Sequence, residues 1–536
     1  MRPTHPHSTG AAPARSAPLT RAVAAGAAAA LLLQAGAGLA GTRLEGYYAL
    51  SMAAQKNDAH WNVGSPDDQG IPGHYAELKF VTNPSDKIEA FAKLRAWNNR
   101  DEGTTATVEY YTPPWYSAEG HLKIGERKWE TYLFYRQNRF YINDEPLLRL
   151  VDDNKLKNDS YGPMAQGLRT DFWDVGIPGV KGLGGTLIVS DTGSDVPYGD
   201  TAYIARLRHK TWNDRVTSGL MFLRKDWYVE SADFPGPEDN RVYSADIAFS
   251  PAGLVESGLR LGPINLEQTR WTTEAAWSST PTAAVDDGSA RIRDRAIACE
   301  VRSIVIGDMT VHAWYNDFGE DFRSYLSQRF DGGNEFNRVQ KHVEGIWLVP
   351  RKAVTAKVAY DHYRKRVADE TGGGLRPTTE WYGEIYAEYM NGFKSRFAYK
   401  RWEGFDQSAE VFDFYTYPEW FGEVSVENFL AKIRMQARVK DTGTFRKVTI
   451  YGFDMQVNIT DRLKGYLRAM NVNEKTEARH TLFAQLKYDL GWGADLYFEY
   501  GDPGQSDNLA YTDWFVNEGT GDNLRDRVKL ILSAWF

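Results

Sequence analysis

The sequence has few of the residues that hold small or metal-dependent folds together. A single cysteine, Cys299, excludes disulfides within the chain and any zinc or iron–sulfur site built from several cysteines. Basic residues are in the minority, with 63 Lys and Arg against 71 Asp and Glu, so the net charge is −8. This balance argues against a nucleic-acid partner, which would favour a basic face.

Long apolar runs are also missing after residue 40, where none approaches the roughly 20 residues of a membrane helix. This excludes a helical inner-membrane protein. Before that point, residues 1–21 carry three arginines and no acid, and residues 22–33 are almost wholly Ala, Val and Leu. Small residues stand at 38 and 40, as a cleavage site requires. The pattern predicts a secretory signal peptide over residues 1–40 and a single domain over residues 41–536.

The mature chain instead shows residues of alternating polarity. In 431–439, Ala, Ile, Met, Ala and Val occupy one parity, and Lys, Arg, Gln and Arg occupy the other. A strand places these two sets on opposite faces, whereas a helix would scatter the charges around its circumference. The same alternation recurs at 201–210, 381–389, 480–490 and 494–500. Repetition along the whole chain predicts an all-β protein.

The connections between these windows come in two lengths that mostly alternate. Short ones resemble turns, and long ones, such as 145–164, 317–337 and 501–525, are polar and are expected as outer loops. An up-and-down membrane barrel has this arrangement, and a β-sandwich has no reason for it. We therefore expect a large closed antiparallel transmembrane β-barrel of about 24 strands, within a range of about 18 to 26. The regions 98–130, 250–290 and 403–427 do not fix the count.

The chain ends in an alternating apolar strand, residues 528–536, whose last residue is Phe536. This strand resembles the closing strand of Gram-negative outer-membrane β-barrel proteins. The resemblance implies that it pairs with the first strand and that the barrel-assembly machinery recognises it. It also implies outer-membrane lipid around the barrel and a location in the outer membrane of a diderm bacterium.

One stretch resembles, more distantly, alginate-export and other substrate-specific porin barrels. Residues 132–151 read YLFYRQNRFYINDEPLLRLV and are followed by a strand at 165–172. The resemblance implies a constriction of the lumen formed by Arg136, Arg139 and Asp171. The alternative is a strand–loop–strand whose charges lie in water.

Charged residues of the inward parity are the candidates for lining the lumen. Basic ones would attract anions, and acidic ones would oppose or balance them. With the three constriction residues, the predicted lumen-lining set is Arg136, Arg139, Asp171, Arg206, Arg208, Lys210, Glu384, Glu388, Lys432, Arg434, Arg438, Arg468, Asp495 and Glu499.

The expected function is a porin-like channel that passes polar small molecules or polysaccharides, with no cofactor, no metal and an oligomeric state left open. An export or assembly component that works with periplasmic partners is the alternative, and a soluble periplasmic β-protein is a further one. A barrel enzyme, lipase or protease, is less favoured. Two D-T-G-[ST] strings begin at Asp191 and Asp441, but both lie where loops are expected, and His312 and His362 are isolated on strand windows. We expect no catalytic residue.

Overall fold

The computed structural model describes most of the chain after the predicted signal peptide, residues 1–40, which lies outside the described residues. Described are residues 42–57, 60–64, 74–98, 115–137, 139–144, 146–151, 158–159, 162–163, 165–177, 180–191, 200–227, 239–252, 259–281, 291–327, 329–330, 337–349, 353–366, 378–389, 392–405, 414–441, 447–473, 478–501 and 527–536. Within these ranges no helix is long and apolar enough to cross a membrane.

The regular elements of the described chain are β-strands, in this order: β1 (Thr42–Asn57), β2 (His60–Gly64), β3 (His74–Ser85), β4 (Ile88–Asn98), β5 (Trp115–Glu126), β6 (Trp129–Tyr135), β7 (Asn158–Asp159), β8 (Gly162–Pro163), β9 (Gln166–Ile177), β10 (Val180–Asp191), β11 (Asp200–Thr211), β12 (Val216–Trp227), β13 (Asp239–Phe249), β14 (Arg260–Leu261), β15 (Ile264–Asn265), β16 (Arg270–Pro281), β17 (Arg291–Ile306), β18 (Met309–Phe318), β19 (Arg338–Val349), β20 (Val354–Lys365), β21 (Thr378–Glu388), β22 (Phe393–Phe405), β23 (Phe414–Glu427), β24 (Ala431–Asp441), β25 (Lys447–Asn458), β26 (Leu463–Asn473), β27 (Ala478–Gly491), β28 (Ala494–Gly501) and β29 (Arg527–Trp535).

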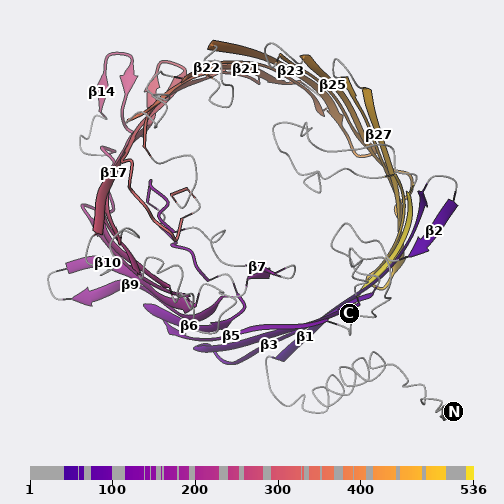
Figure 1. Ribbon diagram of the computed structural model, residues 1–536, viewed down its shortest axis with the longest axis horizontal. Helices are drawn as coiled ribbons and strands as arrows, with labels where there is room; N and C mark the ends of the chain where they lie inside the picture. The colour runs from indigo at the N-terminus through magenta and orange to yellow at the C-terminus, as the bar shows by residue number, and fades with distance from the viewer. Residues whose placement is uncertain are drawn as a thin grey trace, which may run out of the picture.

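The strands close into one antiparallel barrel of 24 strands, as the sequence predicts (Figure 1). Each strand of the ring pairs with the next one along the chain, and β1 pairs with β29 from Tyr47–Trp535 to Gln55–Arg527. Five short strands lie outside the ring: β2 continues the pairing of β1, β14 and β15 form a small hairpin, and β7 and β8 pair only with each other. Closure satisfies every backbone group of the wall and leaves no free sheet edge.

The two faces of the wall differ in polarity, as the alternation predicts. On β24 the outward side chain of Met435 is 56% exposed, while Gln436 on the other face is buried. Across the register, Met435 is opposite Phe453, and Arg434 is opposite Asp454. Apolar side chains on the outer face meet lipid at no cost, whereas an outward Arg at mid-depth would cost about 2–4 kcal/mol. The charges of β24 therefore lie on its inner face.

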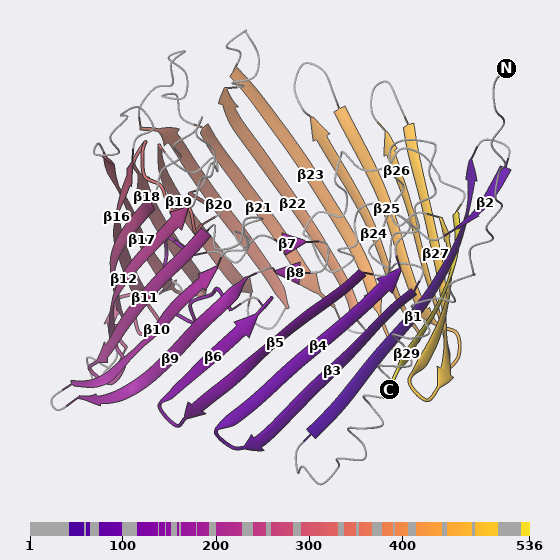
Figure 2. The same cartoon turned by 60° about the horizontal axis from the view of Figure 1, so that its bottom comes forward.

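Short connections lie at one end of the barrel, which we call the turn side, and the longer ones at the other, the loop side (Figure 2). One of the two-residue turns joins β17 to β18 through Gly307, whose positive φ of 59° suits such a hairpin. The region 250–290, whose strands the sequence does not fix, departs from this alternation of short and long connections. Its β14–β15 hairpin lies on the turn side and pairs with the end of β17.

Parts of two stretches that we expected in outer loops, 145–164 and 317–337, lie inside the barrel instead (Figure 1). The first inner segment is residues 139–151, without 145, and the second is residues 319–330, without 328. Both pack against the inner face of one part of the wall, where they bury the main apolar cluster of the described chain. The expectation was wrong for residues 146–151 and 319–330, because the length and polarity of a loop do not show whether it extends into solvent or folds back into the lumen.

Candidate functional site

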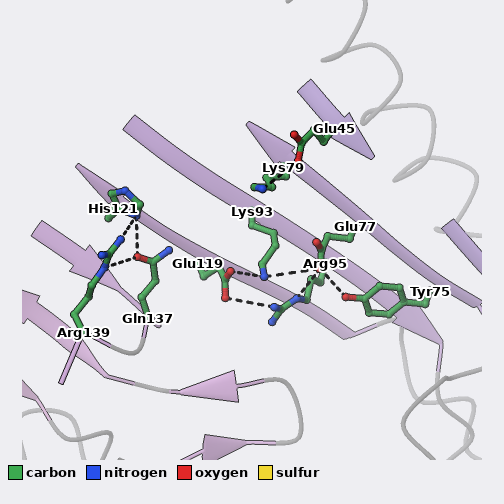
Figure 3. Close-up of polar contacts among 10 residues, drawn as sticks. All are labelled: Glu45, Tyr75, Glu77, Lys79, Lys93, Arg95, Glu119, His121, Gln137 and Arg139. Carbon is green, nitrogen blue, oxygen red and sulfur yellow. Dashed lines mark hydrogen bonds and ion pairs between the residues drawn. The ribbon is translucent and has the colours of Figure 1, made fainter. Parts of the chain in front are cut away.

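The inner face of β3, β4 and β5 carries a network of ion pairs (Figure 3). Lys93 Nζ lies 2.5 Å from Glu119 Oε1 and 3.9 Å from Glu77 Oε2. Arg95 Nε lies 3.1 Å from Glu77 Oε2, and its Nη2 lies 3.5 Å from Glu119 Oε2. The Tyr75 hydroxyl donates to Glu77 at 2.8 Å. Two cations and two carboxylates thus neutralise one another on the wall.

A separate polar cluster, reached two residues further along β5 at His121, holds the predicted constriction residue Arg139. Its Nη2 lies 3.2 Å from His121 Nδ1, which is 2.8 Å from Gln137 Oε1 (Figure 3). The guanidinium also lies over the ring of Tyr132, 4.2 Å from its centroid. Arg136, another predicted member, follows the end of β6 in a left-handed conformation, with φ of 52°. Arg139 is therefore held against the wall by polar and ring contacts.

Ion pairs also cover the opposite wall, where most of the other predicted residues lie. Arg434 and Arg468 share the carboxylate of Asp454, with Arg468 Nε 2.9 Å from Oδ1. Arg438 pairs with Glu419. Around the rest of the barrel, other predicted members form the pairs Glu384–Arg396 (2.7 Å), Asp495–Lys487 (2.8 Å), Glu499–Lys529 (4.0 Å), Lys432–Glu427 (3.5 Å), Glu388–Lys394 (3.9 Å) and Lys210–Asp214 (3.7 Å).

Several of these carboxylates also accept a hydrogen bond from a tyrosine two residues away on the same strand. Tyr75 donates to Glu77, Tyr382 to Glu384, and Tyr386 to Glu388. Since residues two apart share a face of a strand, each Tyr–carboxylate pair lies on the inner face. The wall therefore offers ring faces, hydroxyls and balanced charges side by side.

The apolar cluster between the inner segments and the wall contains several phenylalanines among aliphatic side chains. Phe322 and Phe330 meet edge to face with ring centroids 5.0 Å apart, and Phe318 and Phe330 do so at 5.1 Å. Phe140 of the first inner segment is fully buried beside them in the same cluster. Edge-to-face packing and burial fix the segments where they lie.

Polar anchors hold the first inner segment to the wall. Glu274 of β16 is fully buried, and its Oε2 accepts a hydrogen bond from the Leu148 backbone N–H at 2.6 Å. Its Oε1 accepts one from the Ser244 hydroxyl at 2.5 Å. A buried carboxylate is costly without such donors, so the segment and the wall stabilise each other.

Two arginines of the wall extend this anchoring. Arg206, predicted as a lumen residue, is only 1% exposed and pairs with Asp246 of the wall and, at 3.2 Å, with Asp144 of the first inner segment. Arg208 lies 3.7 Å from the same Asp144. The role of Arg206 in the structure is thus to bind the segment, and its guanidinium is covered.

Arg169 is the second and brings together two predicted residues. Its Nε lies 2.5 Å from the predicted Asp171, and its Nη1 donates to the carbonyl oxygens of Arg139 at 3.0 Å and Tyr141 at 2.6 Å. Asp171 also accepts from the Thr186 hydroxyl at 2.5 Å. Arg139 and Asp171 therefore meet through Arg169, which we did not single out. Its position two residues before Asp171, on the same face of the strand, was the available signal.

The two inner segments also bind each other. The hydroxyls of Ser324 and Ser327 donate to the carbonyl oxygens of Leu150 at 2.9 Å and Arg149 at 2.6 Å. On the wall, Asn240 donates to the carbonyl of Arg323 at 3.2 Å. No local pattern indicates Ser324, Ser327 or Glu274, because the residues of the first inner segment that they bind lie more than a hundred residues away.

The residues weighed for enzyme chemistry lie apart. Asp191 ends β10, Asp441 ends β24, and the residues after each, 192–199 and 442–446, lie outside the described residues. His312 Nδ1 accepts from the backbone of Ser303 at 3.0 Å, and His362 lies 3.5 Å from a tyrosine hydroxyl. Within the described ranges, no three His, Cys, Asp or Glu side chains form a group that could hold a metal ion.

The comparisons with known proteins find a similar fold, but they identify no sequence family. No protein-family model matches the sequence, and no curated protein does. Among solved structures, the chain resembles the siderophore receptor PirA from Pseudomonas aeruginosa, at 9% identity over 92% of this chain and 80% of that one, with a TM-score of 0.45. It resembles the alcaligin outer-membrane receptor FauA from Bordetella pertussis at 9% identity, over 92% and 76% of the two chains, with a TM-score of 0.43.

A higher TM-score, 0.52, relates the chain to the E. coli P pilus tip assembly intermediate PapC–PapD–PapK–PapG. This match has 9% identity and covers 93% of this chain and 61% of that one. At this identity the similarity establishes the fold alone. The chain has the fold of the large closed β-barrels of bacterial outer membranes.

Proposed function

We propose that the protein is an outer-membrane channel that passes polar solutes or saccharides and is permanently narrowed on one side by the two inner segments. The observation that carries this is the contrast between the two parts of the inner wall. One part is covered by segments anchored through Glu274, Arg206 and Arg169. The other carries charged and tyrosine side chains on the inner face, with no inner segment against it among the described residues.

The balance of charges supports polar rather than strongly ionic cargo. Most inner-wall cations lie beside a carboxylate, as in the Lys93–Glu119 and Arg468–Asp454 pairs. A wall whose charges alternate at close range has little net potential, so it neither concentrates nor repels one sign of ion. Tyrosine hydroxyls, guanidinium groups and carboxylates supply both donors and acceptors, which the hydroxyls of saccharides require.

The anchors also determine the kind of channel proposed. A plug that leaves the lumen during transport would need few and exposed contacts with the wall. The inner segments instead share buried phenylalanines and buried hydrogen bonds with it. We therefore propose a constriction that stays in place during passage.

Single-channel conductance in a planar bilayer tests the proposal. We expect steady steps without added partner, and a reversal potential close to zero in a salt gradient because anions and cations pass about equally. Swelling of liposomes that contain the protein should report entry of neutral sugars. A correctly folded barrel that is electrically silent and admits no sugar would overturn the proposal.

Export or assembly with periplasmic partners is the second candidate, since the highest of these TM-scores is to a chain of a pilus assembly intermediate. Isolation of the detergent-solubilised barrel from its own membrane distinguishes the two. Stoichiometric co-purification of a periplasmic protein, together with electrical silence of the barrel alone, would favour this candidate.

A further inference from the structure

On its outer face the barrel has a concentration of arginines at the loop side, where β13, β16 and β17 run side by side. A pocket of about 520 Å³ is lined there by Arg241, Arg291, Arg293, Arg295 and Arg366, with Tyr243 and Trp277. We call it the arginine pocket. Tyr243 and Trp277 are half exposed, Tyr243 is opposite Trp277, and Trp277 is opposite Arg295, so these side chains lie on the outward face.

Part of this positive charge is already neutralised. The carboxylate of Asp239 lies 2.5 Å from both Arg291 Nη1 and Arg241 Nε. Arg366 Nε lies 3.3 Å from Asp317. One carboxylate, Asp294, also lines the pocket, and it accepts backbone N–H groups of Arg295 at 2.7 Å and Asp321 at 2.8 Å.

Two arginines of the pocket remain without a carboxylate among the described residues. Arg293 and Arg295 are exposed on β17 and make no ion pair there. Two more outward cations, Lys341 of β19 and Arg364 of β20, are likewise exposed and unpaired within the described chain. Lys341 shares its face with Val343, which is half exposed to the outside. The uncompensated charge therefore extends beyond the pocket along the loop side.

The depth of the pocket follows from the cost of exposing arginine to lipid. An arginine exposed to lipid at mid-membrane would cost about 2–4 kcal/mol, and one near the interface about 0–1 kcal/mol. Tyrosine and tryptophan prefer the same interfacial level, which agrees with Tyr243 and Trp277 in the pocket wall. Below them on the same faces follow apolar side chains such as Ile247 and Val343. The pocket thus stands at the upper edge of the apolar belt.

We propose that the arginine pocket binds the phosphorylated headgroup of a lipid in the outer leaflet. Guanidinium groups recognise phosphate oxygens by paired hydrogen bonds. A free anion would use the arginines alone, whereas a lipid also covers the apolar belt directly below them. This surface therefore fits an anionic, amphipathic ligand. The proposal rests on the outer-membrane location proposed above and is independent of solute passage.

The test uses the full-length barrel in neutral detergent, with diphosphoryl lipid A as the probe and native mass spectrometry or a thermal shift as readout. We expect saturable binding that weakens about tenfold in the double variant Arg293→Gln/Arg295→Gln. The charge-retaining variant Arg293→Lys/Arg295→Lys should bind with an affinity between those of the wild type and the Gln variant, because lysine keeps the charge but not the paired hydrogen bonds. The matched control Lys87→Gln/Lys128→Gln removes two cations on the turn side, each paired with a carboxylate, and should leave binding unchanged.

Two further probes separate the sources of phosphate. Lipid A without phosphates should bind at least about tenfold more weakly, and inorganic phosphate should not reproduce the thermal shift. Equal binding of phosphorylated and dephosphorylated lipid would overturn the proposal, and so would a Gln double variant that binds normally. A full thermal shift with inorganic phosphate alone would overturn the proposal that the ligand is a lipid and would indicate a site for free anions. None of these readouts uses conductance, so failure of the channel function remains distinguishable.

Discussion

Gly46 and Phe536 hold the two ends of the described barrel together by a reciprocal pair of backbone hydrogen bonds. The Gly46 N–H donates to the Phe536 carbonyl at 2.6 Å, and the Phe536 N–H donates to the Gly46 carbonyl at 3.0 Å. The phenylalanine ring lies where a Cβ on Gly46 would stand, 2.1 Å from its nearest ring carbon. Glycine is therefore required at this position for the ring to cover the backbone of β1.

This contact predicts coupling between the two residues. Gly46→Ala should push the ring away and lower the temperature at which the folded band is lost on unheated gels. Phe536→Ala should also lower this temperature. The double variant should be little less stable than either single variant, because both substitutions remove the same contact between residues 46 and 536. Gly383→Ala is the matched control, since nothing lies within 4 Å of its would-be Cβ. Additive losses in the double variant would contradict the coupling.

Release of the first inner segment is the expected result of Glu274→Ala. The change removes the acceptor of the Leu148 N–H and of the Ser244 hydroxyl, and an unsatisfied buried donor costs about 1–3 kcal/mol. We expect noisier and larger conductance steps and faster proteolysis near residue 148. Glu274→Gln keeps one acceptor oxygen, so its conductance noise and its rate of proteolysis should lie between those of the wild type and Glu274→Ala. Glu126→Ala, at an exposed turn-side carboxylate, serves as control. Unchanged current noise in Glu274→Ala would show that the other anchors, through Arg206 and Arg169, and the apolar contacts hold the segment without Glu274.

The sequence predicts the wall of this barrel well and its interior poorly, for a physical reason. Lipid outside and water inside impose opposite demands on successive residues, so the two faces of residues 431–439 can be recognised from a single strand. The inner segments obey no such local rule. Leu148 is fixed by Glu274, and Leu150 by Ser324, contacts between residues far apart in the chain. In the sequence, Phe140 cannot be distinguished from an apolar residue of a strand, although the structure buries it against the wall.

For the site residues, alternation along a strand indicates the face on which each side chain lies, but not whether its charge is buried or paired. Lys432 and Arg434 lie on the face that their spacing predicts. Arg206 obeys the same parity, yet it is buried because Asp246 and Asp144 approach it from the wall and from an inner segment. The sequence could not pair these residues, since cross-strand neighbours depend on a register set by distant turns.

Charge balance on the wall predicts a selectivity that can be shifted in either direction. Glu77→Gln/Glu119→Gln leaves Lys93 and Arg95 without their carboxylates, so anions should pass preferentially. Lys93→Gln/Arg95→Gln leaves the carboxylates instead and should make the channel cation-selective. The reversal potential in a tenfold salt gradient should therefore move with opposite sign in the two variants. Shifts of the same sign, or none, would mean that this wall does not border the conducting path.

Asp454 should be the most sensitive single position of the opposite wall. Its carboxylate lies beside Arg434, accepts from Arg468 Nε at 2.9 Å and accepts from the Tyr466 hydroxyl at 2.9 Å, and Arg468 is 3% exposed. Asp454→Asn leaves two covered guanidinium groups without a counter-charge. Breaking a buried pair in this way costs about 3–5 kcal/mol.

We therefore expect Asp454→Asn to lose its folded band at a clearly lower temperature than the wild type and to assemble in lower yield. Asp495→Asn is the matched control, because its partner Lys487 is more exposed and can reach water when the pair is broken. The second substitution should lower the transition only slightly, as expected for an exposed pair. The double variant Asp454→Asn/Arg468→Gln should recover part of the loss, since one stranded charge is then removed. Equal sensitivity of Asp454 and Asp495 would show that burial of the arginines does not set the strength of these pairs.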